Sequence, residues 1–147
     1  PNIMLGYWRQ KELTEKAIVN GWMKTGDGAK MDESGYVFIV DRVKDMIISG
    51  GENIYSTEVE NAIYDHPDVL EASVFGIPDE RLGEILCSAI FLRDGSDLDK
   101  DSLTEFLSNK LAAFKIPVVV KFLDCNLPLV ASGKFDKPAL RKMFIEN

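Results

Sequence analysis

Short apolar runs alternate with amphipathic helical segments along residues 46–144, and this alternation limits the possible folds more than any other feature. The segments with the β-branched and aromatic content of strands are residues 69–75, 86–92 and 118–123. One amphipathic helix has its apolar stripe at Leu103, Phe106, Leu107 and Leu111. The sequence therefore predicts an α+β fold in which helices pack on a small mixed sheet.

Turn signals add two hairpins ahead of these strands. The first is predicted over residues 29–41, around turn residues at 32–35. The second is predicted over residues 46–55, where Gly50 and Gly51 permit positive φ at a tight turn. The sheet is thus expected to be preceded by a β-hairpin region.

Three further patterns place the remaining elements. Residues 57–60 have the Thr-x-x-Glu spacing of a capping box, which predicts a helix that ends before Pro67. Residues 76–84 contain Gly, Pro and charged side chains and are predicted to connect two strands. A last short helix is predicted over residues 138–144, after Asp136.

Composition narrows the class of function. The net charge of −7 and the pI of about 4.7 argue against a nucleic-acid surface, because such a surface needs an excess of Lys and Arg. Lys110, Lys115 and Lys121 are the candidates for a local basic spot. Cys87 and Cys125 lack metal-ligand spacing, and with a single histidine no metal site is expected. No apolar run approaches the ~20 residues of a membrane span, so a cytoplasmic protein is predicted.

The candidate for chemistry is Lys134, which follows Ser132 and Gly133 just ahead of a predicted helix start. A Ser-Gly-Lys turn bends tightly and presents an ammonium on a long stem, which suits a lysine that must reach a phosphate or a carboxylate. The alternative is a solvated loop lysine. Two upstream segments favour the chemical role: Thr25-Gly26-Asp27 and the run DRVKDMIISGGENIY at residues 41–55.

These three segments, in this order, resemble the closing part of the adenylate-forming superfamily, which includes acyl-CoA synthetases, peptide-synthetase adenylation domains and luciferases. The resemblance runs from about Gly6 to Leu140, and residues 47–55 are most similar to the acyl-CoA synthetases, among them the fatty acid–CoA ligases. Two positions depart from the family pattern. Gly28 stands where Leu is common, and residues 129–131 replace an Arg/Lys-Thr run.

The resemblance implies ATP, Mg²⁺ and CoA as substrates and cofactor, and a role for each matching residue. Lys134 would bridge the acyl carboxylate and the phosphate oxygens during adenylation. Asp27 and Arg42 would bind the nucleotide ribose, and Asp41 would be the hinge between the two half-reactions. The loop that would line the path of the CoA pantetheine arm consists of Ser49, Gly50, Gly51 and Glu52.

Each of these assignments has a plainer alternative. Asp27 would only close a turn. Arg42 would form a surface ion pair with Asp41 or Asp45, worth about 0–1 kcal/mol. Residues 49–52 would only shape a hairpin.

The chain is expected to be the C-terminal part of a larger enzyme, because a phosphate loop and an acyl pocket are not recognisable in it. Residues 1–40 are predicted to be the end of a large N-terminal domain, and residues 41–147 a complete C-terminal lid domain. The resemblance implies a carboxylic acid–CoA ligase that is active when intact and inactive as this fragment. The alternatives are an adenylation domain that feeds a carrier protein, a luciferase-like enzyme, and a fragment that is inert or acts in trans.

Overall fold

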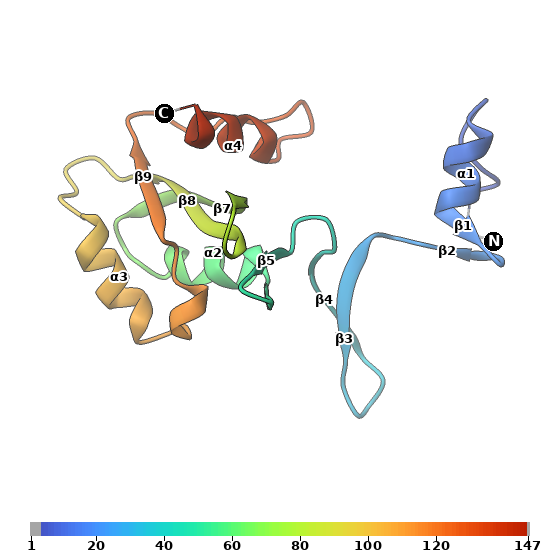
Figure 1. Cartoon of the computed structure of the whole chain (residues 1–147), viewed down its shortest axis with the longest axis horizontal. Helices are drawn as coiled ribbons and strands as arrows, with labels where there is room; N and C mark the ends of the chain where they lie inside the picture. The colour runs from blue at the N-terminus through green and yellow to red at the C-terminus, as the bar shows by residue number, and fades with distance from the viewer. Residues whose placement is uncertain (1–3, 147) are drawn as a thin grey trace. The chain divides into compact units, whose positions relative to one another are not determined.

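The computed structural model describes residues 4–146, and the chain forms two compact units, Pro1–Lys44 and Asp45–Asn147. Residues 1–3, at the start of the predicted N-terminal remnant, and Asn147, at the end of the predicted lid domain, lie outside the described residues. The division between the units falls shortly after the boundary predicted between residues 40 and 41. In Figure 1 the first unit runs from blue to teal.

The first unit contains one short helix and two small hairpins. Its elements are α1 (Lys11–Ala17), β1 (Ile18–Val19), β2 (Trp22–Met23), β3 (Asp27–Met31) and β4 (Val37–Arg42). The pairs β1–β2 and β3–β4 are both antiparallel, and the second pair has a register shift between Gly28 and Ala29. The turn predicted at residues 32–35 is confirmed, because Asp32 Oδ1 accepts hydrogen bonds of 2.9 Å from the backbone N–H groups of Ser34 and Tyr36.

This unit has no apolar core of its own among its described residues. Trp8 and Trp22 are 84% and 79% exposed, and Phe38 and Ile39 on β4 are more than half exposed. Asp41 is the one described residue of the unit that is buried. The apolar side chains of these hairpins are thus not packed within the unit itself.

The second unit is built on a five-stranded mixed sheet. Its strands are β5 (Ile47–Ser49), β6 (Glu52–Ile54), β7 (Val69–Asp79), β8 (Gly83–Leu92) and β9 (Val119–Leu123). β8 pairs antiparallel with β7 over the whole of β8, parallel with β9 from Cys87 to Phe91, and antiparallel with β5 only where Gly83 faces Ser49. The α+β fold with a small mixed sheet is therefore confirmed.

Helices cover both faces of this sheet, as Figure 1 shows. The helical elements are α2 (Ser56–Tyr64), α3 (Lys100–Ser108), the 3₁₀ turn η1 (Ala113–Lys115) and α4 (Lys137–Ile145). One apolar cluster joins α2 and α3 to side chains such as Val74 and Ile90. A second cluster joins α4 to the opposite face, where the rings of Phe75 and Phe144 meet edge to face at 5.0 Å.

Two predictions of local structure were wrong. Residues 76–84 are mostly strand rather than connection, because β7 is an edge strand, where Pro78 needs no ladder hydrogen bond. The capping box predicted at residues 57–60 does not mark the start of the helix, because the N-cap residue is Tyr55. Helix α2 begins at Ser56 without a side-chain cap hydrogen bond, and Glu60 is instead bound to β7 and α4.

Candidate functional site

Lys134 lies at the end of a tight turn that backbone hydrogen bonds hold closed. The N–H of Val130 donates to the carbonyl oxygen of Lys134 (2.8 Å), and the N–H of Gly133 donates to that of Val130 (2.9 Å). Gly133 has a φ of +78°, in the left-handed region that favours glycine. On either side of the turn, Leu129 and Phe135 form an antiparallel bridge. The shape of the turn therefore does not depend on the lysine side chain.

The chain entering this turn is anchored by one carboxylate on β7. Glu71 accepts a hydrogen bond through Oε1 from Asn126 Nδ2 and through Oε2 from the backbone N–H of Leu127, both at 2.7 Å. Leu127 is also buried in the cluster beneath α4. These contacts fix the segment a few residues before Lys134.

The chain leaving the turn is anchored by a helix cap and an ion pair. Asp136 caps α4 by accepting from the N–H of Ala139 (3.0 Å). Lys137 Nζ lies 3.0 Å from Glu60 Oε1 and donates to Ser56 Oγ at 2.8 Å. The side chains of Lys137 and Glu60 are only 18% and 17% exposed. The turn is thus fixed at both ends to α2 and β7.

The side chain of Lys134 itself is exposed, and within residues 4–146 it has no carboxylate partner. Its ammonium therefore extends from a well-fixed turn into solvent. This arrangement fits a lysine that reaches a separate ligand, and it also fits the solvated lysine that the sequence left as an alternative.

Asp27 and Arg42 lie opposite each other across the β3–β4 ladder. Arg42 Nε is 3.6 Å from Asp27 Oδ1, with the two side chains 51% and 27% exposed. The preceding Gly26 has a φ of +80°, and the N–H of Asp27 donates to Thr25 Oγ1 at 3.1 Å. The structure thus brings the two predicted ribose ligands together. The side chain of Arg42 forms its ion pair with Asp27, whereas the alternative expectation was a pair with Asp41 or Asp45.

Asp41, the predicted hinge residue, is buried near the end of β4. Its Oδ1 accepts a hydrogen bond of 2.7 Å from the backbone N–H of Arg42. The border between the two units follows shortly after, between Lys44 and Asp45. The role of Asp41 as a hinge stays a prediction.

The predicted CoA-facing loop forms a two-residue turn between β5 and β6. Ser49 pairs with Glu52, and Gly50 and Gly51 between them have φ values of +59° and +86°. Two positive φ values in succession are typical of a type I′ turn, which glycine adopts without strain. The glycines are therefore needed for the hairpin geometry, whether or not the CoA arm also passes this turn.

The predicted site residues fall on three separate segments. Asp27, Asp41 and Arg42 belong to the first unit, whereas residues 49–52 and Lys134 lie on different turns of the second. Within the described chain, no hydrogen bond or ion pair joins Lys134 to residues 49–52. Within the second unit, over its described residues 45–146, Lys134 and the predicted CoA-facing loop are therefore held by separate sets of contacts.

The three candidate basic residues are each engaged elsewhere. Lys110 pairs with Asp65 at 2.8 Å, and Lys115 pairs with Glu58 at 2.6 Å. Lys121 Nζ donates to a backbone carbonyl of α4 at 3.0 Å. These lysines tie elements of the second unit to one another and do not form a basic surface.

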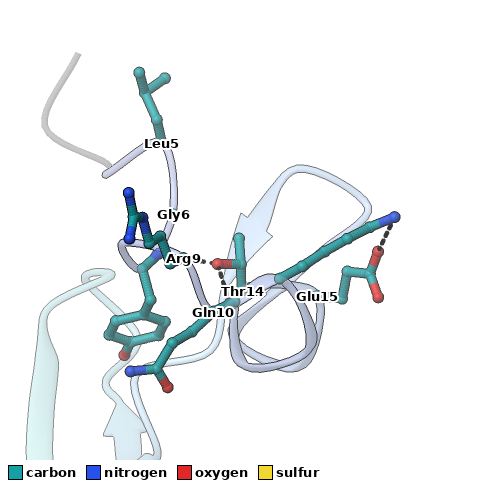
Figure 2. A pocket seen from close by; sticks show the side chains of 8 residues that line it. Leu5, Gly6, Arg9, Gln10, Thr14 and Glu15 are labelled. Atoms are coloured by element: carbon teal, nitrogen blue, oxygen red, sulfur yellow. Dashed lines mark hydrogen bonds and ion pairs between the residues drawn. The ribbon is translucent and has the colours of Figure 1, made fainter.

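The remaining features do not suggest a second reactive site. Figure 2 shows a pocket in the first unit, lined by α1 and the residues before it, where Thr14 Oγ1 accepts from the N–H of Tyr7 at 2.9 Å. No predicted site residue lines this pocket.

The buried cysteine is not reactive. Burial raises the pKa of the Cys87 thiol to about 11, although the charge of Lys121 opposes the shift, so this thiol stays protonated near neutral pH. Residues 4–146 contain no cluster of three or more metal-ligating side chains and no helix long and apolar enough to cross a bilayer.

Comparison with known proteins identifies the family. The model of the AMP-binding enzyme C-terminal domain matches residues 58–134, which is more than half of the chain. The chain belongs to this family. A feruloyl-CoA synthase from Amycolatopsis is 46% identical to it over 98% of the chain, and the bovine mitochondrial medium-chain acyl-CoA ligase is 45% identical over 99%.

A solved structure shows that the fold is also shared. The o-succinylbenzoate CoA synthetase of Bacillus subtilis, in complex with its acyl-adenylate, matches 96% of this chain with a TM-score of 0.89 and 38% identity. The chain spans only 29%, 24% and 28% of the length of these three proteins, respectively.

Sequence reasoning missed the anchors of the Lys134 turn. Glu71 and Leu127 are 56 residues apart, and Lys137 and Ser56 are 81 residues apart. No local pattern signals such pairs, because they depend on how α2, β7 and α4 pack. A charged residue at the start of a helix would normally be assigned to solvent.

Proposed function

We propose that this chain is the C-terminal lid of an ATP-dependent carboxylic acid–CoA ligase that works through an acyl-adenylate. The observation that carries the proposal is the exposed ammonium of Lys134, held on a turn that is fixed at both ends, in a member of the AMP-binding enzyme C-terminal family. The acyl-CoA ligase names of its relatives support the same reaction class.

In the first half-reaction, the substrate carboxylate attacks the α-phosphorus of ATP. A new P–O bond forms, the bond to the β-phosphate oxygen breaks, and pyrophosphate leaves with the electron pair. Two anions approach each other in this step, so a cation at the reacting oxygens lowers the barrier. We assign this charge to Lys134, since its ammonium has no carboxylate partner within the described chain and a long stem on which to reach the site.

In the second half-reaction, the sulfur of CoA attacks the acyl carbon. A C–S bond forms, the C–O bond to AMP breaks, and AMP leaves with the electron pair while the thiol proton passes to solvent. We assign the turn of residues 49–52 to this step, because two glycines leave a backbone surface that a narrow pantetheine arm can approach closely.

The nucleotide would be oriented by Asp27 and Arg42. Asp27 is a carboxylate that can accept hydrogen bonds from ribose hydroxyls, and Arg42 lies next to it across the ladder. Asp41, buried close to the border of the two units, is the proposed hinge about which the lid presents first Lys134 and then residues 49–52.

The proposal requires a large N-terminal domain that supplies the acyl pocket and the phosphate loop. Exposed Trp8 and Trp22 in the first unit support such a partner, since large apolar side chains are usually covered. The Mg²⁺ expected with ATP would need ligands from the phosphates and from that domain, since residues 4–146 do not provide a ligand cluster.

The proposed compartment is a reducing cytoplasm. The exposed free thiol of Cys125 agrees with this proposal.

The experiment uses the intact enzyme that contains this chain. It is incubated with ATP, Mg²⁺, CoA and, in turn, ferulate, o-succinylbenzoate and a series of fatty acids, and the products are followed by mass spectrometry. We expect AMP, pyrophosphate and one acyl-CoA in equal amounts. Parallel reactions replace CoA by a pantetheinylated carrier protein, or omit any thiol and supply oxygen.

The parallel reactions separate the alternatives. Acyl transfer to the carrier protein but not to CoA would favour an adenylation domain, and light emission would favour a luciferase-like enzyme. Turnover only after this chain is added to a separately expressed N-terminal domain would show that it acts in trans. If no acid yields an adenylate or a thioester, the proposed function is wrong.

A further inference from the structure

The turn between β7 and β8 holds the hairpin that carries the Gly50-Gly51 turn. The N–H of Gly50 donates to the carbonyl oxygen of Leu82 at 2.9 Å. The N–H of Ile48 donates to the side chain of Glu84, at Oε2, also at 2.9 Å. One hydrogen bond to the β7–β8 turn and one to the start of β8 thus hold the glycine turn and the adjoining strand β5.

The hairpin needs this support because its strands are short. β5 and β6 contain three residues each, and a hairpin of this length is only marginally stable alone. Its ladder to the rest of the sheet consists of the single pair Ser49 and Gly83. Ile47 and Ile54, which pair at the open end of the hairpin, are buried in the core. Ile48, closer to the glycine turn, is 49% exposed and does not anchor that end by apolar packing.

Glu84 reaches Ile48 through space that a glycine leaves open. A Cβ on Gly76 would lie 2.7 Å from Glu84 Oε1 and 2.8 Å from its carboxyl carbon. Gly76 does not have a positive φ, so its backbone alone would accept another residue. A side chain at position 76 would instead meet the carboxylate of Glu84, and its Cβ would also lie 3.0 Å from Ile47 Cγ2.

The carbonyl of Leu82 is positioned by a second carboxylate. Asp79 Oδ1 accepts hydrogen bonds from the backbone N–H groups of Arg81 (3.0 Å) and Leu82 (2.8 Å). This turn fixes the orientation of the backbone that then accepts from Gly50. The β7–β8 turn is therefore shaped by its own hydrogen bonds, and it contacts the hairpin through Leu82 while Glu84, at the start of β8, supplies the second contact.

We propose that Glu84 is a positioning residue for thioester formation, because it fixes the Gly50-Gly51 turn where the CoA arm is to pass. This inference rests on the proposed function of residues 49–52. Glu84 does not touch the reacting atoms; it acts through the backbone of Ile48. Since the turn that carries Lys134 is anchored through other carboxylates, Glu60 and Glu71, loss of Glu84 should leave the adenylation step intact.

The test measures the two half-reactions separately in the intact enzyme. One arm follows pyrophosphate release from acid and ATP, and the other follows acyl-CoA formed from the purified acyl-adenylate and CoA. The acid is the one that the wild type uses best. We expect Glu84→Ala to slow thioester formation by about 10- to 100-fold and to leave adenylation within about twofold of the wild type.

A matched control and a spatial partner sharpen the test. Glu80→Ala removes the same charge from an exposed position of the neighbouring β7–β8 turn and should change neither arm. Gly76→Ala places a methyl group where the carboxylate lies, so it should slow the same arm as Glu84→Ala and add little to it in the double variant. Hydrogen exchange of residues 47–54 should be faster in Glu84→Ala and Gly76→Ala, but not in Glu80→Ala.

Glu84→Gln tests the hydrogen bond, because an amide oxygen still accepts from Ile48 but without the charge. It should keep more of the thioester activity than Glu84→Ala, and together with Gly76→Ala it carries the test if the alanine variant does not fold. The inference is overturned if Glu84→Ala behaves like Glu80→Ala, or if both arms slow equally. A wild type that forms adenylate but no acyl-CoA would instead refute the proposed function, and this inference with it.

Discussion

Lys134 and Lys137 are three positions apart, yet their surroundings are opposite. Lys134 extends into solvent and has no carboxylate partner within the described chain. Lys137 is largely buried, 3.0 Å from Glu60 and hydrogen-bonded to Ser56. The first lysine is available for a ligand, whereas the second joins α4 to α2. The difference shows that one short segment can contain both a lysine that anchors the fold and a lysine that is exposed to solvent. The residue type alone does not distinguish these two roles.

The anchor explains how an exposed lysine can still be well placed. A catalytic cation must be held near its target before the reaction, because ordering it during the reaction would raise the barrier. The turn before Lys134 is closed by its own backbone and tied down by Glu71 and Glu60. In the proposed adenylation step, only the Lys134 side chain would then remain to be ordered within the second unit.

Lys137→Ala should have the largest effect on stability. It leaves the carboxylate of Glu60 largely buried with the backbone N–H of Val74 as its remaining recorded partner. We expect a loss of about 2 to 4 kcal/mol in the free energy of unfolding, somewhat below the value for fully buried pairs. Urea denaturation of the chain measures it. Lys134→Ala should stay within about 0.5 kcal/mol of the wild type, and equal losses for the two variants would remove the contrast between them.

Glu71→Ala should have the next largest effect. It removes the acceptor for Asn126 and for the backbone N–H of Leu127, which is part of the core beneath α4. The expected cost is about 1 to 3 kcal/mol, because a half-buried donor loses its partner. The same denaturation experiment tests this value, with Glu146→Ala as the control, since the side chain of Glu146 forms an exposed pair with Lys142. A loss no larger than that of the control would mean that the entry to the turn is held by apolar packing alone.

The smallest effect distinguishes two buried serines. Ser56 accepts a hydrogen bond from Lys137, whereas the hydroxyl of Ser88 has no recorded partner in the described chain. Ser56→Ala should therefore cost about 1 kcal/mol, while Ser88→Ala should be close to neutral. Thermal unfolding of both variants gives the comparison. A greater loss for Ser88→Ala would contradict the assignment of Ser56 to the Lys137 anchor.

Much of the fold could be predicted from the sequence because many of its elements are determined by residues close together in the chain. The apolar stripe of α3, the glycine pair between β5 and β6, and Asp136 ahead of α4 each determine structure within a few residues. The extent of β7 and β8 was missed, since Gly and Pro in residues 76–84 suggest a loop until the edge position of β7 is known. Local chemistry thus predicted these elements but not how far β7 and β8 extend.

The candidate site was predictable only in part, for the same reason. The segments around Asp27, residues 49–52 and Lys134 could be found from short motifs. The side chains that support them, Glu60, Glu71 and Glu84, reach them from elsewhere in the sequence. A carboxylate that accepts a backbone N–H dozens of residues away has no local signature, so only the structure separates it from a solvated acid.

The central claim is that Lys134 supplies the charge for adenylation from a turn that folds without its side chain. The most direct measurement is ATP–pyrophosphate exchange by the intact enzyme for the wild type, Lys134→Ala and Lys142→Ala, an exposed lysine of α4. We predict a fall of about 10²- to 10³-fold for Lys134→Ala and no change for Lys142→Ala. Acyl-CoA formation from supplied acyl-adenylate should continue in both variants. If Lys134→Ala exchanges pyrophosphate as fast as Lys142→Ala, Lys134 is a solvated lysine and the account is wrong.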